Sequence, residues 1–232
     1  MKVLLALLAA GLMSVAPAMA APSGTIVAFG DSITKGLVGN PWPAVLQKRL
    51  QARFPKAGIA VVNAGLGGEQ LLDSAPDLPA GVGRFERDAL GQKDVRIVIL
   101  LEGINDIGHL DWALDKGAPG AAERDLPLEI IAGYRTLIAQ AHAQGVRLYG
   151  GTLLPFEGSG YYGAKGEAAR QVVNRWIRTA GAFDAMVDFD AALRDPADSA
   201  RLRPIYDSGD HLHPNTAGEA AMAAAIDLAA LE

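Results

Sequence analysis

Four short segments, far apart in the sequence, carry the residue types that acyl transfer by a serine requires. Such a reaction needs a hydroxyl nucleophile, a base that takes its proton, a carboxylate that orients the base, and donors for the developing oxyanion. Ser32 is the candidate nucleophile and His213 the candidate base. Asp210 stands three residues before His213, so we expect one loop to hold the aspartate and histidine together.

The two remaining segments offer donors for an oxyanion. The candidates are the backbone N–H groups of Ser32 and Gly68 and the side-chain amide of Asn105. Losing one donor of this kind typically lowers turnover by about a hundredfold to a thousandfold. The sequence thus predicts the catalytic residues Ser32, Asp210 and His213, with an oxyanion hole formed by Ser32, Gly68 and Asn105.

Each of these residues also has a structural interpretation. Taken alone, Ser32 is a turn serine and Asn105 an Asx-turn residue. Asp210 and His213 would then be a loop carboxylate and a surface histidine. His211 leaves a third interpretation open, because Asp210, His211 and His213 together resemble carboxylate and imidazole ligands of a metal. No distant fourth ligand stands out in the sequence, so the serine chemistry is preferred.

For the other histidines and for several aromatic residues, the sequence gives weaker evidence of a functional role. We expect His109 and His142 to be structural or exposed. Four aromatic residues fall in or near predicted rim loops, where they would either pack or stack on a sugar or aromatic acyl group. They are Trp42, Trp112, Tyr161 and Tyr162.

Strands and helices must bring these segments together. Five short runs rich in β-branched residues predict strands, and they alternate with longer helical patterns. The predicted strands are residues 25–29, 59–63, 95–101, 146–153 and 185–189. The predicted helices are residues 43–53, 81–90, 127–144, 164–181 and 216–231, and residues 195–204 form a polar loop. Strands that are apolar on both faces predict a parallel sheet between two helical layers, a three-layer α/β/α sandwich.

The candidate residues follow the ends of the first three predicted strands. In open α/β sheets, ligands bind beyond the carboxyl ends of the strands. At the first strand end, a glycine permits a sharp turn and Asp31 is expected to hold the turn through its side chain. The motif G-x-S-x-G does not fit, because Thr34 stands at its second glycine. A phosphate-binding loop does not fit either, because Gly36 is followed by Leu37.

These segments resemble, in order, the four sequence blocks of the SGNH or GDSL hydrolases. The blocks are Gly30-Asp31-Ser32, Gly68, Gly103-Ile-Asn105-Asp106 and Asp210-His-Leu-His213-Pro214. The resemblance implies an esterase, lipase or thioesterase with a five-stranded, flavodoxin-like parallel sheet and no metal or organic cofactor. It places the nucleophile on Ser32, the oxyanion donors on Gly68 and Asn105, and the remaining pair on Asp210 and His213. Gly68 is chosen over Gly65 and Gly67 because it precedes an acidic residue, as the family's glycine often does.

The resemblance also bears on the substrate. Residues 101–108 and 152–157 are similar to secreted members associated with plant polysaccharide breakdown, which implies acetyl or feruloyl esters of sugars. A lysophospholipase, lipase or thioesterase would use the same catalytic set but would need a long apolar groove, for which residues 108–124 offer one wall. A noncatalytic carbohydrate-binding protein on the same fold is a third hypothesis, against which the complete catalytic set argues.

Composition and the first residues bear on compartment and partners. Residues 1–20 have a positive start, an apolar stretch and Ala18-Met19-Ala20, which predicts a signal peptide cleaved after Ala20. We therefore expect residues 21–232 to form one domain that is exported, either periplasmic or secreted, without stable membrane insertion. A formal charge of −5 and no basic cluster argue against a nucleic-acid partner. The absence of cysteine excludes disulfides and thiolate metal sites. The expected partner is a small-molecule or carbohydrate ester.

Overall fold

Five parallel strands form the centre of the computed structural model, which describes residues 23–231. The predicted signal peptide lies outside the described residues. The strands are β1 Ser23–Gly30, β2 Gly58–Gly65, β3 Val95–Leu101, β4 Arg147–Gly151 and β5 Ala185–Val187. Their order is β2-β1-β3-β4-β5, so the chain reverses direction across the sheet between β1 and β3. This is the flavodoxin-like order that the family resemblance implies, and its reversal point is where ligands bind in such sheets.

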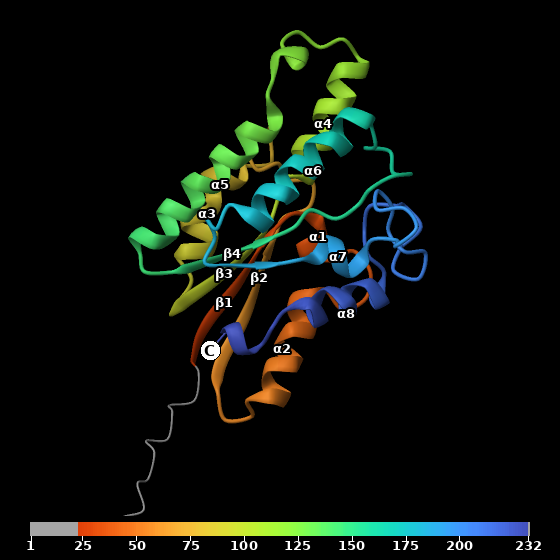
Figure 1. Cartoon of the computed structure of the whole chain (residues 1–232). Helices are drawn as coiled ribbons and strands as arrows, with labels where there is room; N and C mark the ends of the chain where they lie inside the picture. The colour runs from red at the N-terminus through yellow and green to blue at the C-terminus, as the bar shows by residue number, and fades with distance from the viewer. Residues whose placement is uncertain (1–22, 232) are drawn as a thin grey trace, which may run out of the picture.

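Helices cover both faces of the sheet (Figure 1). The longer ones are α2 Trp42–Arg53, α4 Ile104–Asp115, α5 Leu126–Ala143, α6 Ala164–Thr179 and α8 Thr216–Ala225. Shorter ones are α1 Ser32–Lys35, α3 Gly81–Phe85, a π-helical turn Glu86–Leu90, α7 Phe189–Leu193 and 3-10 turns at Ala121–Glu123 and Ala229–Leu231. Helices α2 and α8 lie on one face, and α3, α5 and α6 lie on the other. The predicted three-layer sandwich is confirmed.

The central strands explain why the apolar pattern was continuous rather than alternating. From Ile26 to Phe29 in β1, and from Ile97 to Leu101 in β3, every residue is buried. Because helices cover both sides of the sheet, neither face of these strands meets water. Each large apolar side chain buried in this way stabilises the fold by roughly 1.5–3 kcal/mol relative to its exposed state.

Some predicted boundaries were wrong. The segment that begins at residue 104 was expected to be a rim loop, but it forms helix α4. Its glycine at position 108 obscured the helical pattern, and in the structure that glycine leaves room for the ring of Tyr161. The last helix was expected to reach residue 231, but α8 ends at Ala225, and Ile226 is extended before the final 3-10 turn. The strands β4 and β5 are two residues shorter at their carboxyl ends than predicted.

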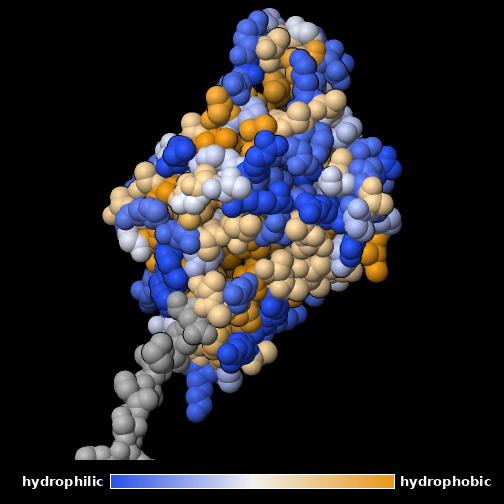
Figure 2. All heavy atoms as spheres, viewed as in Figure 1, coloured by the Kyte–Doolittle hydropathy of each residue, from blue (hydrophilic) through white to orange (hydrophobic). Residues whose placement is uncertain are grey.

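The surface shows polar and apolar residues mixed. Figure 2, drawn from the same side as Figure 1, shows hydrophilic residues spread across this face and hydrophobic ones in smaller groups between them. Within residues 23–231, no helix has both the length and the apolar character needed to cross a membrane.

Candidate active site

The three central strands end at one level of the sheet. Gly30 at the end of β1 is paired with Gly65 of β2 on one side and with Leu101 of β3 on the other. A side chain at Gly30 would not fit, because a Cβ atom there would lie 2.2 Å from Oγ1 of Thr34 and 2.5 Å from the carbonyl oxygen of Leu101. The glycine therefore lets the chain turn at once from β1 into α1.

Ser32 is the first residue of α1 and is half-buried. The preceding Asp31 caps this helix, since its Oδ1 accepts a hydrogen bond of 2.8 Å from the backbone N–H of Ile33. The pKa of Asp31 is raised to about 7, mainly by burial and to a lesser extent by the negative charges of Glu69 and Asp106, against the opposing effect of the Ile33 hydrogen bond. The expectation that Asp31 holds the turn through its side chain is met by this bond.

The loop between α7 and α8 is closed by Asp207 and Pro214, which form an isolated bridge. Within it, Oδ1 of Asp210 accepts the backbone N–H groups of Leu212 at 3.0 Å and His213 at 2.8 Å. The hydroxyl of Ser208 donates to the same oxygen at 2.9 Å. Oδ2 of Asp210 lies 2.6 Å from Nδ1 of the His213 ring. The aspartate is thus fixed by the turn that also presents the histidine.

The other ring nitrogen of His213 contacts the serine. Nε2 lies 2.8 Å from Oγ of Ser32, across a separation of 181 residues. Burial tends to raise the pKa of Asp210, but hydrogen bonds from the His213 backbone and ring outweigh it and hold that pKa well below its usual value. An ionised carboxylate only accepts hydrogen bonds, so Nδ1 carries the proton and Nε2 accepts from the serine hydroxyl. The structure therefore brings Ser32, His213 and Asp210 into one hydrogen-bonded chain.

The candidate oxyanion donors come from neighbouring loops at the same edge. The loop after β2 returns toward β1, because the N–H of Leu66 donates to the carbonyl of Gly30 at 2.8 Å. Gly68 is exposed in this loop with φ +78°. The amide Nδ2 of buried Asn105 donates to the carbonyl of Glu69 at 2.7 Å. This bond joins Asn105 to the residue after Gly68 and leaves the amide a second N–H.

A left-handed glycine places Asn105. Gly103 has φ +117°, a backbone conformation that other residues rarely adopt, and it directs the chain from β3 into α4. Asn105 therefore lies in the first turn of that helix. The next residue, Asp106, binds the backbone N–H groups of Leu71 at 2.7 Å and Leu72 at 2.9 Å. Asp106 thus supports the loop, and burial raises its pKa to about 6 despite these hydrogen bonds.

A buried charged cluster beneath the site was not predicted. Arg84 forms an ion pair with Glu69, and both side chains are buried. The same guanidinium donates to the carbonyl of Gly30 at 3.1 Å and lies 3.9 Å from the centre of the Phe29 ring. Arg84 thus joins the end of β1, two residues before Ser32, to the loop that carries Gly68. Its only sequence signal was an arginine on the apolar side of the segment 81–90.

Glu102 belongs to the same cluster. It is fully buried, and its pKa is raised well above its usual value by burial and by the neighbouring charges of Asp31 and Glu69. The hydroxyl of Tyr134 donates to the Glu102 backbone carbonyl at 2.6 Å. A raised pKa favours the neutral form of this carboxyl, which reduces the negative charge that Arg84 must balance.

A second aspartate–histidine pair lies in the same loop. Nδ1 of His211 is 2.5 Å from Oδ2 of Asp207, and the His211 backbone N–H donates to Oδ1 of Asp207 at 3.0 Å. The two imidazoles of the loop are therefore held by different carboxylates. Among residues 23–231, no three His, Cys, Asp or Glu side chains are arranged to hold a metal ion. The geometry thus offers no support for the alternative of a metal bound by Asp210, His211 and His213.

The candidate aromatic residues separate into buried and exposed ones. Trp42 is completely buried at the start of α2 and packs 5.4 Å from the Phe189 ring, so of its two interpretations packing is correct and stacking on a substrate is not. Tyr161 is half-buried against α4, with its ring 5.9 Å from that of exposed His109. Tyr162 and Trp112 are exposed. The other histidine, His142, binds Asp184 at 2.9 Å.

Comparison with known proteins agrees with this arrangement. The GDSL-like Lipase/Acylhydrolase family matches residues 28–221, and the chain belongs to that family. It is a carboxylic ester hydrolase of the SGNH or GDSL class. An acetylxylan esterase of Geobacillus stearothermophilus is 28% identical over 218 residues, which cover 85% of this chain and 90% of the relative.

Solved structures show the same fold. The acetylxylan esterase Axe2 of Geobacillus stearothermophilus matches with a TM-score of 0.64 and 24% identity over 92% of this chain and 96% of its own. LAE5, an alpha/beta hydrolase enzyme from the metagenome of Lake Arreo in Spain, matches with a TM-score of 0.65 and 24% identity over 91% and 96% of the two chains.

Proposed function

We propose that this protein is a serine esterase that removes small acyl groups, acetyl above all, from polysaccharides or their fragments through an acyl-enzyme. The observation that carries the catalytic assignment is the contact of 2.8 Å between Oγ of Ser32 and Nε2 of His213. The substrate assignment is supported by the similarity to an acetylxylan esterase.

The reaction begins with attack of the Ser32 oxygen on the ester carbonyl carbon. His213 takes the hydroxyl proton at Nε2, and Asp210 stabilises the imidazolium through Nδ1–H without itself becoming protonated. The carbonyl oxygen, now negative, is bound by the backbone N–H groups of Ser32 and Gly68 and by the free N–H of the Asn105 amide. When the tetrahedral intermediate collapses, the sugar oxygen leaves with the proton from His213 and the acyl group remains on Ser32.

Water completes the cycle by the same steps. His213 removes a proton from a water molecule, and the resulting hydroxide attacks the acyl-enzyme carbonyl. The second intermediate releases the carboxylic acid, and the proton returns from His213 to Ser32. The products are one free sugar hydroxyl and one acid for each water consumed.

A fluorophosphonate ester tests the nucleophile. We expect it to label Ser32 alone, as shown by mass spectrometry of the digested protein, and to abolish ester hydrolysis. The Ser32→Ala variant should remain unlabelled. A label on another residue would overturn the assignment, and unchanged ester hydrolysis in Ser32→Ala would defeat the serine mechanism. No ester hydrolysis by the original protein would favour the noncatalytic carbohydrate-binding alternative.

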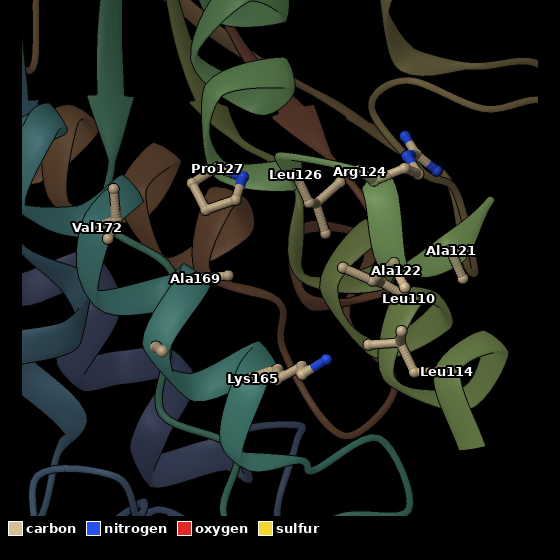
Figure 3. Close-up of a pocket in the computed structure, with 11 residues that line it drawn as sticks. Leu110, Leu114, Ala121, Ala122, Arg124, Leu126, Pro127, Lys165, Ala169 and Val172 are labelled. Atoms are coloured by element: carbon tan, nitrogen blue, oxygen red, sulfur yellow. The ribbon is translucent and has the colours of Figure 1, made fainter. Parts of the chain in front are cut away.

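Chain-length profiling tests the acyl group. Aryl esters from acetate to palmitate should give the highest kcat/KM at acetate, and acetylated xylan should release acetic acid. A maximum at long chains would support a lipase, lysophospholipase or thioesterase. The structure has an apolar pocket of about 250 Å³ between α4 and α6 (Figure 3), and residues 108–124 do form one wall. However, neither Ser32, Asn105 and His213 nor the residues next to them in sequence are among its lining residues, so it does not favour that alternative.

Export is part of the same proposal. Its support is the pattern of residues 1–20, with the site after Ala20. Expression of the full chain in a bacterial host should yield a mature protein that begins at Ala21, measured by amino-terminal sequencing of the periplasmic and culture fractions. A cytoplasmic product that retains Met1 would contradict it.

A further inference from the structure

We propose that a pocket of about 360 Å³ beside the oxyanion loop binds the sugar portion of the substrate, with Trp112 as its stacking surface. This inference rests on the proposed function and assigns the residues that recognise the leaving group. The pocket is formed by the loop after β2, by α4 and by the segment that follows α4. Its volume falls within the roughly 300–1,000 Å³ of typical small-molecule sites.

Two residues of the pocket adjoin the candidate oxyanion hole along the chain, although the donors themselves do not line the pocket. Gln70 and Asp106 both line it. Gln70 directly follows Glu69, and Asp106 directly follows Asn105. The Asn105 amide donates a hydrogen bond of 2.7 Å to the Glu69 carbonyl. An acetyl group extends only one methyl beyond the ester carbonyl. A substrate that reaches from the oxyanion donors into this pocket must therefore reach it with its alcohol portion, which is the sugar.

The walls combine an exposed aromatic ring with polar groups. The Trp112 residue is 62% exposed although it carries one of the largest apolar side chains of the protein. An indole gives a rigid apolar face that packs against the C–H face of a pyranose. Gln70, His109 and the ion pair of Asp73 with Arg124 at 2.8 Å line the same pocket. These groups both donate and accept hydrogen bonds, as a ligand rich in hydroxyl groups requires.

The neighbouring pocket shows what an acyl-binding wall would look like. The pocket of Figure 3 lies on the other side of Leu110 and Ala121, which line both pockets. Its remaining walls are largely aliphatic, with Leu114, Leu126 and Val172, and its charged side chains are Lys165 and Arg124, which lines both pockets. The pocket at Trp112 adds hydrogen-bonding side chains that its neighbour lacks, namely Gln70, Asp73 and His109, beside one aromatic ring. Such a lining is suited to a neutral sugar and ill suited to a hydrocarbon chain, which would leave those polar groups without water.

Binding of an unacetylated ligand tests the inference without relying on catalysis. Xylotetraose, titrated into the full-length protein by calorimetry, should bind with a Kd that rises about tenfold in Trp112→Ala and is largely restored in Trp112→Phe. Leu128→Ala is the matched control, because Leu128 is equally exposed, at 60%, on α5 and lines neither of the two pockets. It should bind as the original protein does. Equal affinity in Trp112→Ala, or no binding by the original protein at millimolar xylotetraose, would overturn the inference.

Kinetics separate this inference from the proposed function. In Trp112→Ala, the ratio of kcat/KM for acetylated xylotetraose to that for p-nitrophenyl acetate should fall about tenfold, mainly through KM. Acetic acid release from acetylated xylan that is unchanged in Trp112→Ala would defeat the inference and leave the esterase function standing. If xylotetraose binds in a way that depends on Trp112 but the acetylated ligand releases no acetic acid, the sugar pocket would stand and the esterase function would fail.

Discussion

Two aspartate–histidine pairs lie within eight residues of one loop, and only one of them contacts a nucleophile. In both pairs, Nδ1 of the ring bonds to Oδ2 of the aspartate and the histidine backbone N–H bonds to Oδ1 of the same aspartate. The two pairs differ in which side chain is exposed to solvent. The His213 side chain is 13% exposed beside an Asp210 that is 49% exposed, whereas His211 is 51% exposed beside an Asp207 that is 11% exposed.

This difference shows that an oriented imidazole is not by itself an active site. His211 also has a left-handed backbone, with φ +62°. Its ring lies against Gly158, in the loop between β4 and α6. His213 instead faces the strand end that presents Ser32. The local turn makes both pairs, and the rest of the fold decides which of them has a hydroxyl to deprotonate.

The largest expected effect comes from replacing each of the two histidines with alanine. His213→Ala should lower kcat for an aryl acetate by at least about 10⁴-fold, as loss of the base does in other serine hydrolases. His211→Ala should lower it by less than about threefold. Steady-state kinetics of the two purified variants, with circular dichroism to show that both fold, make the comparison. An equal loss in both would mean that the second pair acts in the reaction.

The aspartates offer a finer version of the same test. Asp210→Asn should lower kcat about 10³-fold, because an amide both favours the wrong imidazole tautomer and fails to stabilise the imidazolium. Asp207→Asn should cost less than about tenfold in kcat, and it should instead lower the thermal midpoint, since Asp207 accepts the backbone N–H groups of Gly209 and His211. Kinetics and thermal melts of both variants measure the two effects. Greater catalytic damage from Asp207→Asn would reverse our ranking of the pairs.

A third change leaves both pairs intact and removes an oxyanion donor. Asn105→Ala should reduce kcat by about a hundredfold to a thousandfold while changing KM by less than about threefold, because its amide is needed only once charge develops on the substrate oxygen. The rate of fluorophosphonate labelling should fall in parallel. Activity within a few-fold of the original would exclude Asn105 from the oxyanion hole.

The smallest expected effect concerns α8, the helix that follows this loop. Glu219 lies in its first turn, buried, and accepts a hydrogen bond of 2.6 Å from the N–H of Trp42. Burial raises its pKa from 4.5 to about 8, although the Trp42 hydrogen bond opposes the shift. At pH below 4.5 the carboxyl is protonated in both the folded and unfolded chains. As pH rises toward about 8, the unfolded chain loses this proton before the folded one, so stability falls.

Glu219→Gln removes that titration and keeps an acceptor for Trp42. Between pH 5 and pH 9, the thermal midpoint of the variant should therefore decline less than that of the original protein. At pH 9 the difference between the two declines should be about 5 °C. The buried carboxyls of Asp31, Asp106 and Glu102, whose pKa values are also raised, contribute the same decline to both proteins. Calorimetric melts across this pH range measure the difference. Parallel declines would show that Glu219 does not supply the pH dependence.

Much of the architecture follows from local patterns. Continuous apolar runs identified the five strands, and glycine and asparagine at their ends marked the edge that carries the site. Helix α4 was missed because Gly108 and several charged residues interrupt its apolar pattern, and because its first turn carries Asn105, which favours turns. The two short helices α1 and α7 lie below the length at which periodicity is informative.

By itself, the sequence determined the order of the strands along the chain, the sharp turn before Ser32 and the three-residue spacing of Asp210 and His213, because each depends on neighbouring residues. Only the tertiary structure decided that His213 rather than His211 meets Ser32, that Arg84 joins the end of β1 to Glu69 in the loop after β2, and that Trp42 is buried while Trp112 is exposed. Those outcomes depend on contacts between residues far apart in the chain, and the burial and electrostatic energies of such contacts exist only once the sheet and its helices have packed.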